Sequence, residues 1–147
     1  MSDPRDIIGR AIQVARERAG PVMKANFVHD DWVMSVEEFE AFWSTNPVAG
    51  FCTVSPEGRP HVVPIEPSLV EGCLVMSTFA DAVRVRDLRD NPNAALISWA
   101  SPWEVVVVYG RASIEGEGQP MLTVRLVPDR IYCIRPPSSH HASTLSP

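Results

Sequence analysis

Cysteine, positive charge and long apolar runs are all scarce in this sequence of 147 residues. The three cysteines are far apart and form no CxxC pair, so we expect no disulfide framework or zinc ribbon, but buried thiols in a reducing compartment. The net charge of −5 predicts no basic surface for nucleic acid. No apolar run approaches the roughly 20 residues of a membrane helix, and the N-terminus does not resemble a signal peptide. We therefore expect a cytoplasmic protein with no nucleic-acid or membrane partner.

The common catalytic motifs are absent as well. The sequence contains no GxSxG, HExxH, P-loop or GxGxxG pattern. Two histidine-bearing segments, at residues 29–31 and at His140-His141, have no second ligand cluster elsewhere, so we interpret both as solvated and predict no metal site. If the protein is an enzyme, we expect a cofactor to carry the reaction, and we assign no catalytic side chain.

Two helices are predicted in the first third of the chain. Ser2 or Asp3 caps the first, in which apolar residues recur at helical spacing. The second begins at a capping box formed by Ser35 and Glu38. The segment between the two helices has no clear period. We expect residues 1–34 to form a helix and a connector that pack on the main domain.

From residue 51 the apolar period changes to two, which predicts strands. Gly110 is expected to form a bulge in the longest strand. A short helix over residues 82–90, capped by Asp81, interrupts the series. The expected strands cover residues 51–54, 59–66, 94–99, 104–114, 121–127 and 131–134, with a second hairpin over 70–77 and a turn at Pro128-Asp129 between the last two strands.

Short connections between these strands favour one antiparallel barrel. We expect the barrel domain to span residues 35–136 and residues 137–147 to form a flexible tail.

The strand expected over residues 59–66 holds Pro60 and Pro64. Residues four apart in a strand direct their backbone N–H toward the same lateral edge, and proline has no N–H. That edge therefore cannot support a regular ladder. Some of its backbone groups are left free for another partner.

Three runs follow one another in the middle of the chain: VAGFCTVSPEGRPHVVPI, LVMSTFADAVRVRDLRDNPNAALISW and VVVVYGRASI. Their order and spacing resemble the split β-barrel flavin and deazaflavin family related to pyridoxamine 5′-phosphate oxidase, over residues 36–114. The resemblance implies a mainly β fold with flanking helices, built as a six-stranded antiparallel split barrel of Greek-key type. It also implies a homodimer with FMN, or the deazaflavin F420, at the subunit interface.

In proteins of this kind the HVVPI strand lies along the ring system of the cofactor. The resemblance therefore assigns the backbone around Val63, Pro64 and Ile65 to the ring, and His61 is a weaker candidate contact. Trp103 flanks the hairpin that, by resemblance, reaches the cofactor of the other subunit. Trp103 is equally consistent with the core of the barrel or of the dimer.

The resemblance assigns the cofactor phosphate to the step from strand to helix. Ser77 and Thr78 match the family's hydroxyl groups, Arg84 matches its basic residue, and Arg86 is a second candidate. A guanidinium offers phosphate a two-pronged hydrogen bond, and a helix start adds free N–H groups. The alternative is that both arginines pair with acidic residues on a solvated helix.

Two departures from the family pattern bear on the site. Asp87 stands where relatives often have Asn, and Asp81 brings negative charge close to the expected phosphate. The loop at residues 115–120 replaces a helical segment that many relatives carry, which predicts a more open pocket.

The leading hypothesis is an FMN- or F420-dependent oxidoreductase that transfers hydride to or from a small-molecule substrate. The alternative is a non-catalytic protein of the same fold that binds or senses flavin or haem.

Overall fold

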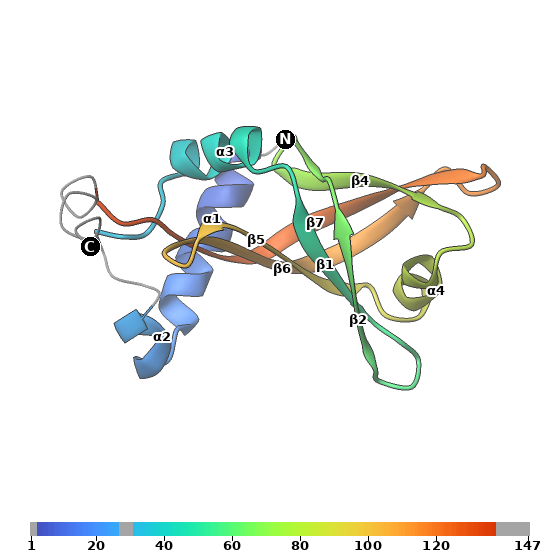
Figure 1. Ribbon diagram of the computed structural model, residues 1–147, viewed down its shortest axis with the longest axis horizontal. Coiled ribbons are helices and arrows are strands. Elements are labelled where there is room, and N and C mark those ends of the chain that lie inside the picture. The colour runs from blue at the N-terminus through green and yellow to red at the C-terminus, as the bar shows by residue number, and fades with distance from the viewer. Residues whose placement is uncertain (1–2, 27–30, 138–147) are drawn as a thin grey trace.

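The computed structural model describes residues 3–26 and 31–137, which contain four helices and seven strands (Figure 1). The candidate metal residues His29, Asp30, His140 and His141 lie outside the described residues. The helices are α1 (Pro4–Arg18), α2 (Pro21–Asn26), α3 (Val36–Thr45) and α4 (Val83–Asp90). The strands are β1 (Ala49–Val54), β2 (Pro60–Ile65), β3 (Ser68–Val70), β4 (Cys73–Phe79), β5 (Asn93–Ser101), β6 (Glu104–Glu115) and β7 (Met121–Ile134).

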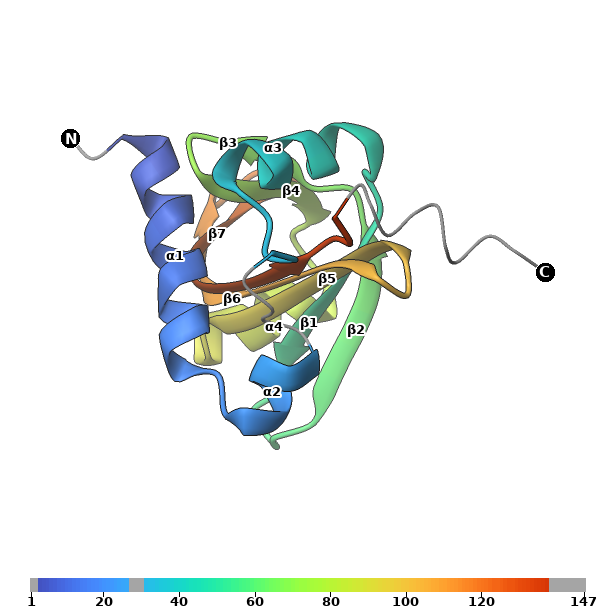
Figure 2. The ribbon, with the colours of Figure 1, turned by 90° about the vertical axis from the view of Figure 1, so that its left-hand side faces the viewer.

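The seven strands of the described residues form one antiparallel sheet in the order β2-β1-β5-β6-β7-β4-β3. The sheet curls into a barrel, and Figure 2 looks into one end of it. Its two terminal strands, β2 and β3, follow each other in the chain but do not pair with each other. The barrel is therefore split between them. The predicted split β-barrel with flanking helices is confirmed. It has seven strands instead of the expected six, because a separate short strand, β3, precedes the turn at Glu71-Gly72.

The turn expected at Pro128-Asp129 is wrong, because β7 runs without a break from Met121 to Ile134. Instead, β7 carries a bulge at this point, with Asp129 as the extra residue between Pro128 and Arg130. The register of β6 against β7 shifts between Tyr109 and Gly110, and Gly110 faces Pro128. A side chain at Gly110 would place its Cβ 2.1 Å from the carbonyl oxygen of Val127, so glycine is required there. The bulge predicted in β6 at Gly110 is therefore on the wrong strand: it lies opposite Gly110, in β7, where it accommodates Pro128 in a long strand.

The helices close the core of the barrel. Helix α1 lies along its side in Figure 2 and buries its apolar stripe against β7. Helix α3 contributes Phe39, Phe42 and Trp43, whose rings meet edge to face with centroids 5.4 and 6.1 Å apart for the two pairs that include Trp43. The segment without a clear period contains α2.

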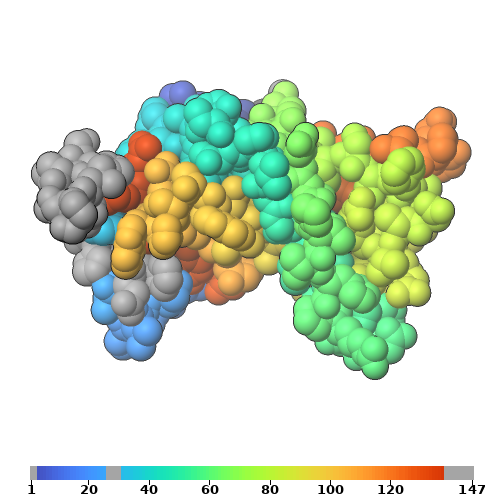
Figure 3. Space-filling model, in the orientation of Figure 1, coloured from blue at the N-terminus to red at the C-terminus, as the bar shows by residue number. Residues whose placement is uncertain are grey.

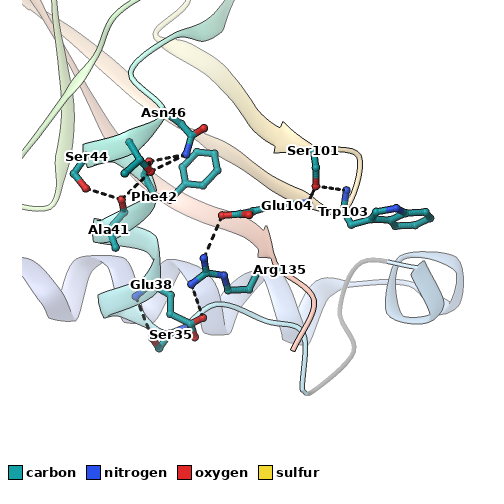
Figure 4. Close-up of polar contacts among 11 residues, drawn as sticks. Ser35, Glu38, Ala41, Phe42, Ser44, Asn46, Ser101, Trp103, Glu104 and Arg135 are labelled. Carbon is teal, nitrogen blue, oxygen red and sulfur yellow. Dashed lines mark hydrogen bonds and ion pairs between the residues drawn. The ribbon is translucent and has the colours of Figure 1, made fainter. Parts of the chain in front are cut away.

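The predicted capping box is confirmed. The backbone N–H of Glu38 donates to Ser35 Oγ over 3.1 Å, and the N–H of Ser35 donates to Glu38 Oε1 over 3.2 Å. Arg135, just after β7, donates to Glu38 over 3.1 Å and to Glu104 at the start of β6 over 3.3 Å (Figure 4). These bonds fix the start of α3 to the end of the sheet.

Candidate functional site

The open edge of β2 is the first part of the candidate site. In the pairing of β2 with β1, Pro60 faces Val54 and Pro64 faces Gly50. Because proline has no N–H to donate, these must be the non-hydrogen-bonded pairs of the ladder. The carbonyl groups of Pro60, Val62 and Pro64, together with the N–H of Val62, then point to the open edge. This is the donor-poor edge that the two prolines predicted.

A groove of about 440 Å³ lies beside this strand on the outer face of the sheet. The same face carries the β5–β6 hairpin and the β1–β2 pair toward the viewer in Figure 3. Val62, Ile97 and Trp99 are exposed around the groove although they are large and apolar. The groove is lined by Val48, Ala49, Gly50, Val62, Val63, Pro64, Ile97 and Trp99.

The structure divides the residues assigned to the cofactor ring. Val63 and Pro64 line the groove, whereas the Ile65 side chain packs against the hydrophobic core. His61 does not line the groove either, since its ring contacts α4. Alternation along the strand places His61, Val63 and Ile65 on the inner face, so Val63 borders the groove although its side chain, like that of Ile65, packs against the core.

A buried hydrogen-bond network joins β1, β2 and α4. Asp87 on α4 is fully buried, and its Oδ2 atom accepts from Thr53 Oγ1 over 2.8 Å. The same oxygen lies 2.6 Å from Nδ1 of His61, whose side chain is 37% exposed. The Oδ1 atom of Asp87 is buried and has no hydrogen-bond partner in the described part of the chain.

Asp87 is held in its charged form despite its burial. Burial alone would raise its pKa, but the hydrogen bonds from His61 and Thr53, together with the positive charges of His61 and Arg86, hold the pKa of this carboxyl below its ordinary value. The sequence analysis considered Asp87 only as a departure from the family pattern and missed this network. No local pattern could have found it, because Thr53, His61 and Asp87 meet only when α4 docks on the barrel.

The residues assigned to the phosphate are also divided. Ser77 and Thr78 point to opposite faces of β4, so Thr78 is buried and Ser77 is exposed. Arg84 is half-buried, whereas Arg86 is exposed. Within the described residues, neither Thr78 Oγ1 nor Arg84 Nε has a hydrogen-bond partner, although both atoms are buried.

The start of α4 lies close to these groups. The N–H of Ala82 donates to the carbonyl of Phe79 over 3.1 Å, so β4 turns directly into the helix. The expected cap at Asp81 is wrong: the residue at the cap position is Ala82, and no side chain within the described ranges caps the helix. The acidic pairing proposed as an alternative for the arginines is not seen, since no ion pair of Arg84 or Arg86 is formed within residues 3–26 and 31–137.

The two tryptophans near the β5–β6 hairpin differ in position. Trp99 lines the groove, whereas Trp103 lies at the hairpin turn, where its N–H donates to Ser101 Oγ over 3.2 Å (Figure 4). Both side chains are about 60% exposed, at 61% and 60%. Neither belongs to the core of the barrel, so the dimer core and the cofactor of a second subunit stay as predictions for Trp103.

Other candidate chemistry is limited. Burial raises the pKa of the Cys133 thiol to about 12, which leaves it inert at neutral pH. Among the described residues, no group of three metal-binding side chains is formed. In the same part of the chain, no helix is long and apolar enough to cross a membrane.

Comparison with known proteins identifies the family. The family model for pyridoxamine 5′-phosphate oxidase matches residues 35–142, which is well over half of the chain. The chain belongs to the pyridoxamine 5′-phosphate oxidase family. The match begins at the capping box of α3 and includes all seven strands described above. No curated protein matches the sequence at comparable significance.

Solved structures show that this family fold is shared widely. A conserved hypothetical protein, Rv2991 from Mycobacterium tuberculosis, is 18% identical, with a TM-score of 0.64 over 71% of this chain and 88% of that one. The haem storage protein HutZ from Vibrio cholerae is 14% identical, with a TM-score of 0.59 over 67% of this chain and 93% of that one. An F420 reductase is 15% identical, with a TM-score of 0.52 over 57% and 87%. At these identities the likeness shows the fold alone.

Proposed function

We propose that this protein is a cofactor-dependent oxidoreductase that binds FMN, with F420 as the alternative, between the subunits of a homodimer. The observation that carries the proposal is a pair of buried donors that have no partner among the described residues, Thr78 Oγ1 near the end of β4 and Arg84 Nε in the first turn of the uncapped α4. Leaving a buried donor unpaired costs about 1–3 kcal/mol, so such groups call for an acceptor. A phosphate group at this helix start would satisfy them.

The open edge of β2 fits the ring of the same cofactor. Flavin and deazaflavin rings carry carbonyl and N–H groups along one side, and the edge offers carbonyl groups together with the N–H of Val62. The apolar groove beside the edge provides a surface for the flat ring system. Val63 and Pro64 keep their proposed contacts with the ring through this strand. Ile65 contributes through its backbone, because its side chain belongs to the core.

The homodimer is supported by the outer face of the sheet. The register aligns Pro64, Gly50, Ile97, Val107 and Tyr132 in one row across five strands. Exposed apolar surface of this kind is typical of an interface between proteins. A second copy packed on it would bring the exposed Trp103 hairpin of one subunit toward the groove of the other.

When bound, the cofactor supplies the hydride transfer. The task of this chain is to bind and orient: the barrel holds the strand edge rigid, α4 anchors the phosphate, and the groove excludes water from the ring face.

The visible absorption spectrum of purified protein tests this proposal. Flavin or deazaflavin bands, present at purification or after addition of FMN or F420, are expected. A Soret band with haemin but no flavin binding would instead favour the non-catalytic haem-binding alternative. No band change with any of the three compounds would refute cofactor binding.

A further inference from the structure

The network around Asp87 does more than join secondary-structure elements. A completely buried carboxylate is costly unless it is paired. Here one oxygen of Asp87 is hydrogen-bonded both to the Thr53 hydroxyl and to Nδ1 of His61. Hydrogen bonding from Nδ1 to Asp87 fixes the orientation of the imidazole and leaves Nε2 as its outward-facing nitrogen. The exposed part of the His61 side chain makes Nε2 available to a ligand.

The same network sets His61 beside the proposed phosphate site. Arg84 and Asp87 are three residues apart in α4, so they lie on the same side of the helix. Because His61 is bonded to Asp87, its ring is held on the side of α4 that carries the half-buried Arg84. One further charge acts on this region, because Arg86 attracts the carboxylate of Asp87 from the same helix, and β1 contributes the neutral hydroxyl of Thr53.

We propose that His61 binds the cofactor phosphate through Nε2, and that Asp87, supported by Thr53, is the positioning residue that orients the imidazole beside Arg84. This inference rests on the proposed function, because it names a residue and its support within the same site. The buried carboxylate balances the positive charge of the ring when Nε2–H donates to the anion. The contact differs from the ring contact expected for His61 by resemblance, since the side chain faces away from the groove.

Matched variants and two ligands test the proposal. His61→Gln removes the charge and Asp87→Asn keeps the shape of the positioning residue, whereas Arg89→Ala removes a cation from the same helix that pairs with Glu117 at the surface. Affinity is measured for FMN and for riboflavin, which lacks the phosphate. We expect His61→Gln and Asp87→Asn to weaken FMN by roughly tenfold to a hundredfold and to leave riboflavin unchanged. Arg89→Ala should leave the affinities for FMN and for riboflavin unchanged.

The result that overturns the proposal is equally specific. If both variants weaken FMN and riboflavin by the same factor, or leave FMN unchanged, the phosphate contact is wrong while the proposed function stands. A general loss of structure would affect both ligands, so it cannot imitate a loss that is confined to FMN.

Nuclear magnetic resonance of protein labelled with ¹⁵N-histidine provides a readout that does not depend on flavin. In the wild-type protein we expect Nδ1 of His61 to carry a proton and Nε2 to shift on titration with inorganic phosphate. If the wild-type protein binds none of FMN, riboflavin and F420, the proposed function fails, and this titration alone decides the role of His61. An Nε2 resonance that stays constant throughout, or a proton on Nε2 with none on Nδ1, would refute it.

Discussion

Asp87 carries a charge at a position with no exposure to solvent, and the fold depends on the groups that surround it. Its pKa lies below the ordinary value, since the hydrogen bonds from His61 and Thr53 outweigh the effect of burial. A carboxyl whose pKa is lower in the folded than in the unfolded state stabilises the fold above the unfolded value of about 4. That stabilisation is lost as the pH falls below this value, through the lower pKa of the folded state.

The first prediction concerns this loss of stability at low pH. Between about pH 5 and pH 3, the wild-type protein should lose more free energy of unfolding than Asp87→Asn, which has no carboxyl to protonate at this position. Urea denaturation at both pH values measures the difference. Asp90→Asn changes an exposed carboxylate on the same helix and should keep the wild-type pH dependence. Equal pH dependence in wild type and Asp87→Asn would show that the network does not stabilise the fold through this charge.

The second prediction concerns Arg84, whose Nε is buried without a partner among the described residues. If a phosphate accepts from this guanidinium, Arg84→Ala should weaken FMN by roughly tenfold to a hundredfold, the worth of a charged hydrogen bond. Riboflavin should bind with nearly unchanged affinity. Titration of flavin fluorescence measures both constants. An equal loss for the two ligands would remove Arg84 from the phosphate site.

At the scale of the elements, the long strands β6 and β7 depend on one close contact. The Cα of Gly110 approaches the backbone of β7 so closely that an added Cβ would meet the carbonyl oxygen of Val127 at 2.1 Å. Neither backbone can move away easily, because the ladder continues on both sides of the bulge. The bulge therefore requires glycine for reasons of space.

The third prediction follows from that contact. Gly110→Ala should lower the free energy of unfolding by about 1–3 kcal/mol, the usual cost of forcing extra atoms into a packed site. Gly20→Ala is the matched control, because no atom lies within 4 Å of the added Cβ there. Chemical denaturation of the two variants gives the comparison. A Gly110→Ala protein as stable as the control would mean that the strands separate at the bulge without loss.

Local patterns predicted most elements, and long-range packing accounts for what they missed. The capping box of Ser35 and Glu38 is readable because it depends on residues close in sequence, and Gly110 marked the place of the bulge but not its strand. The turn at Pro128-Asp129 was wrong because these residues form a bulge within β7, and only the pairing of β7 with β6 distinguishes a bulge from a turn. The contact of His61 with Asp87 spans 26 residues and depends on the docking of α4.

At the scale of the whole molecule, the unpaired outer face of the sheet remains to be explained. Besides the row through Ile97, the register places Trp99 beside Val105 and Val105 beside Ile134. A second groove, of about 230 Å³, continues the apolar surface over β6 and β7. Stable dimers bury about 800 Å² on each partner, and a face that spans five strands is wide enough to supply such an area.

The fourth prediction tests this face in solution. Ile97 lies at the centre of the row and is exposed in the single chain, so Ile97→Asp should place an unpaired charge inside the dimer interface and convert the dimer to monomers. Val70→Asp is the control, because Val70 is also exposed but lies on β3 at the other end of the sheet. Light scattering after gel filtration measures the mass of each variant. A site shared between subunits requires that FMN binding be lost together with the dimer in Ile97→Asp and kept in Val70→Asp. A monomeric variant that still binds FMN with wild-type affinity would place the cofactor within one chain.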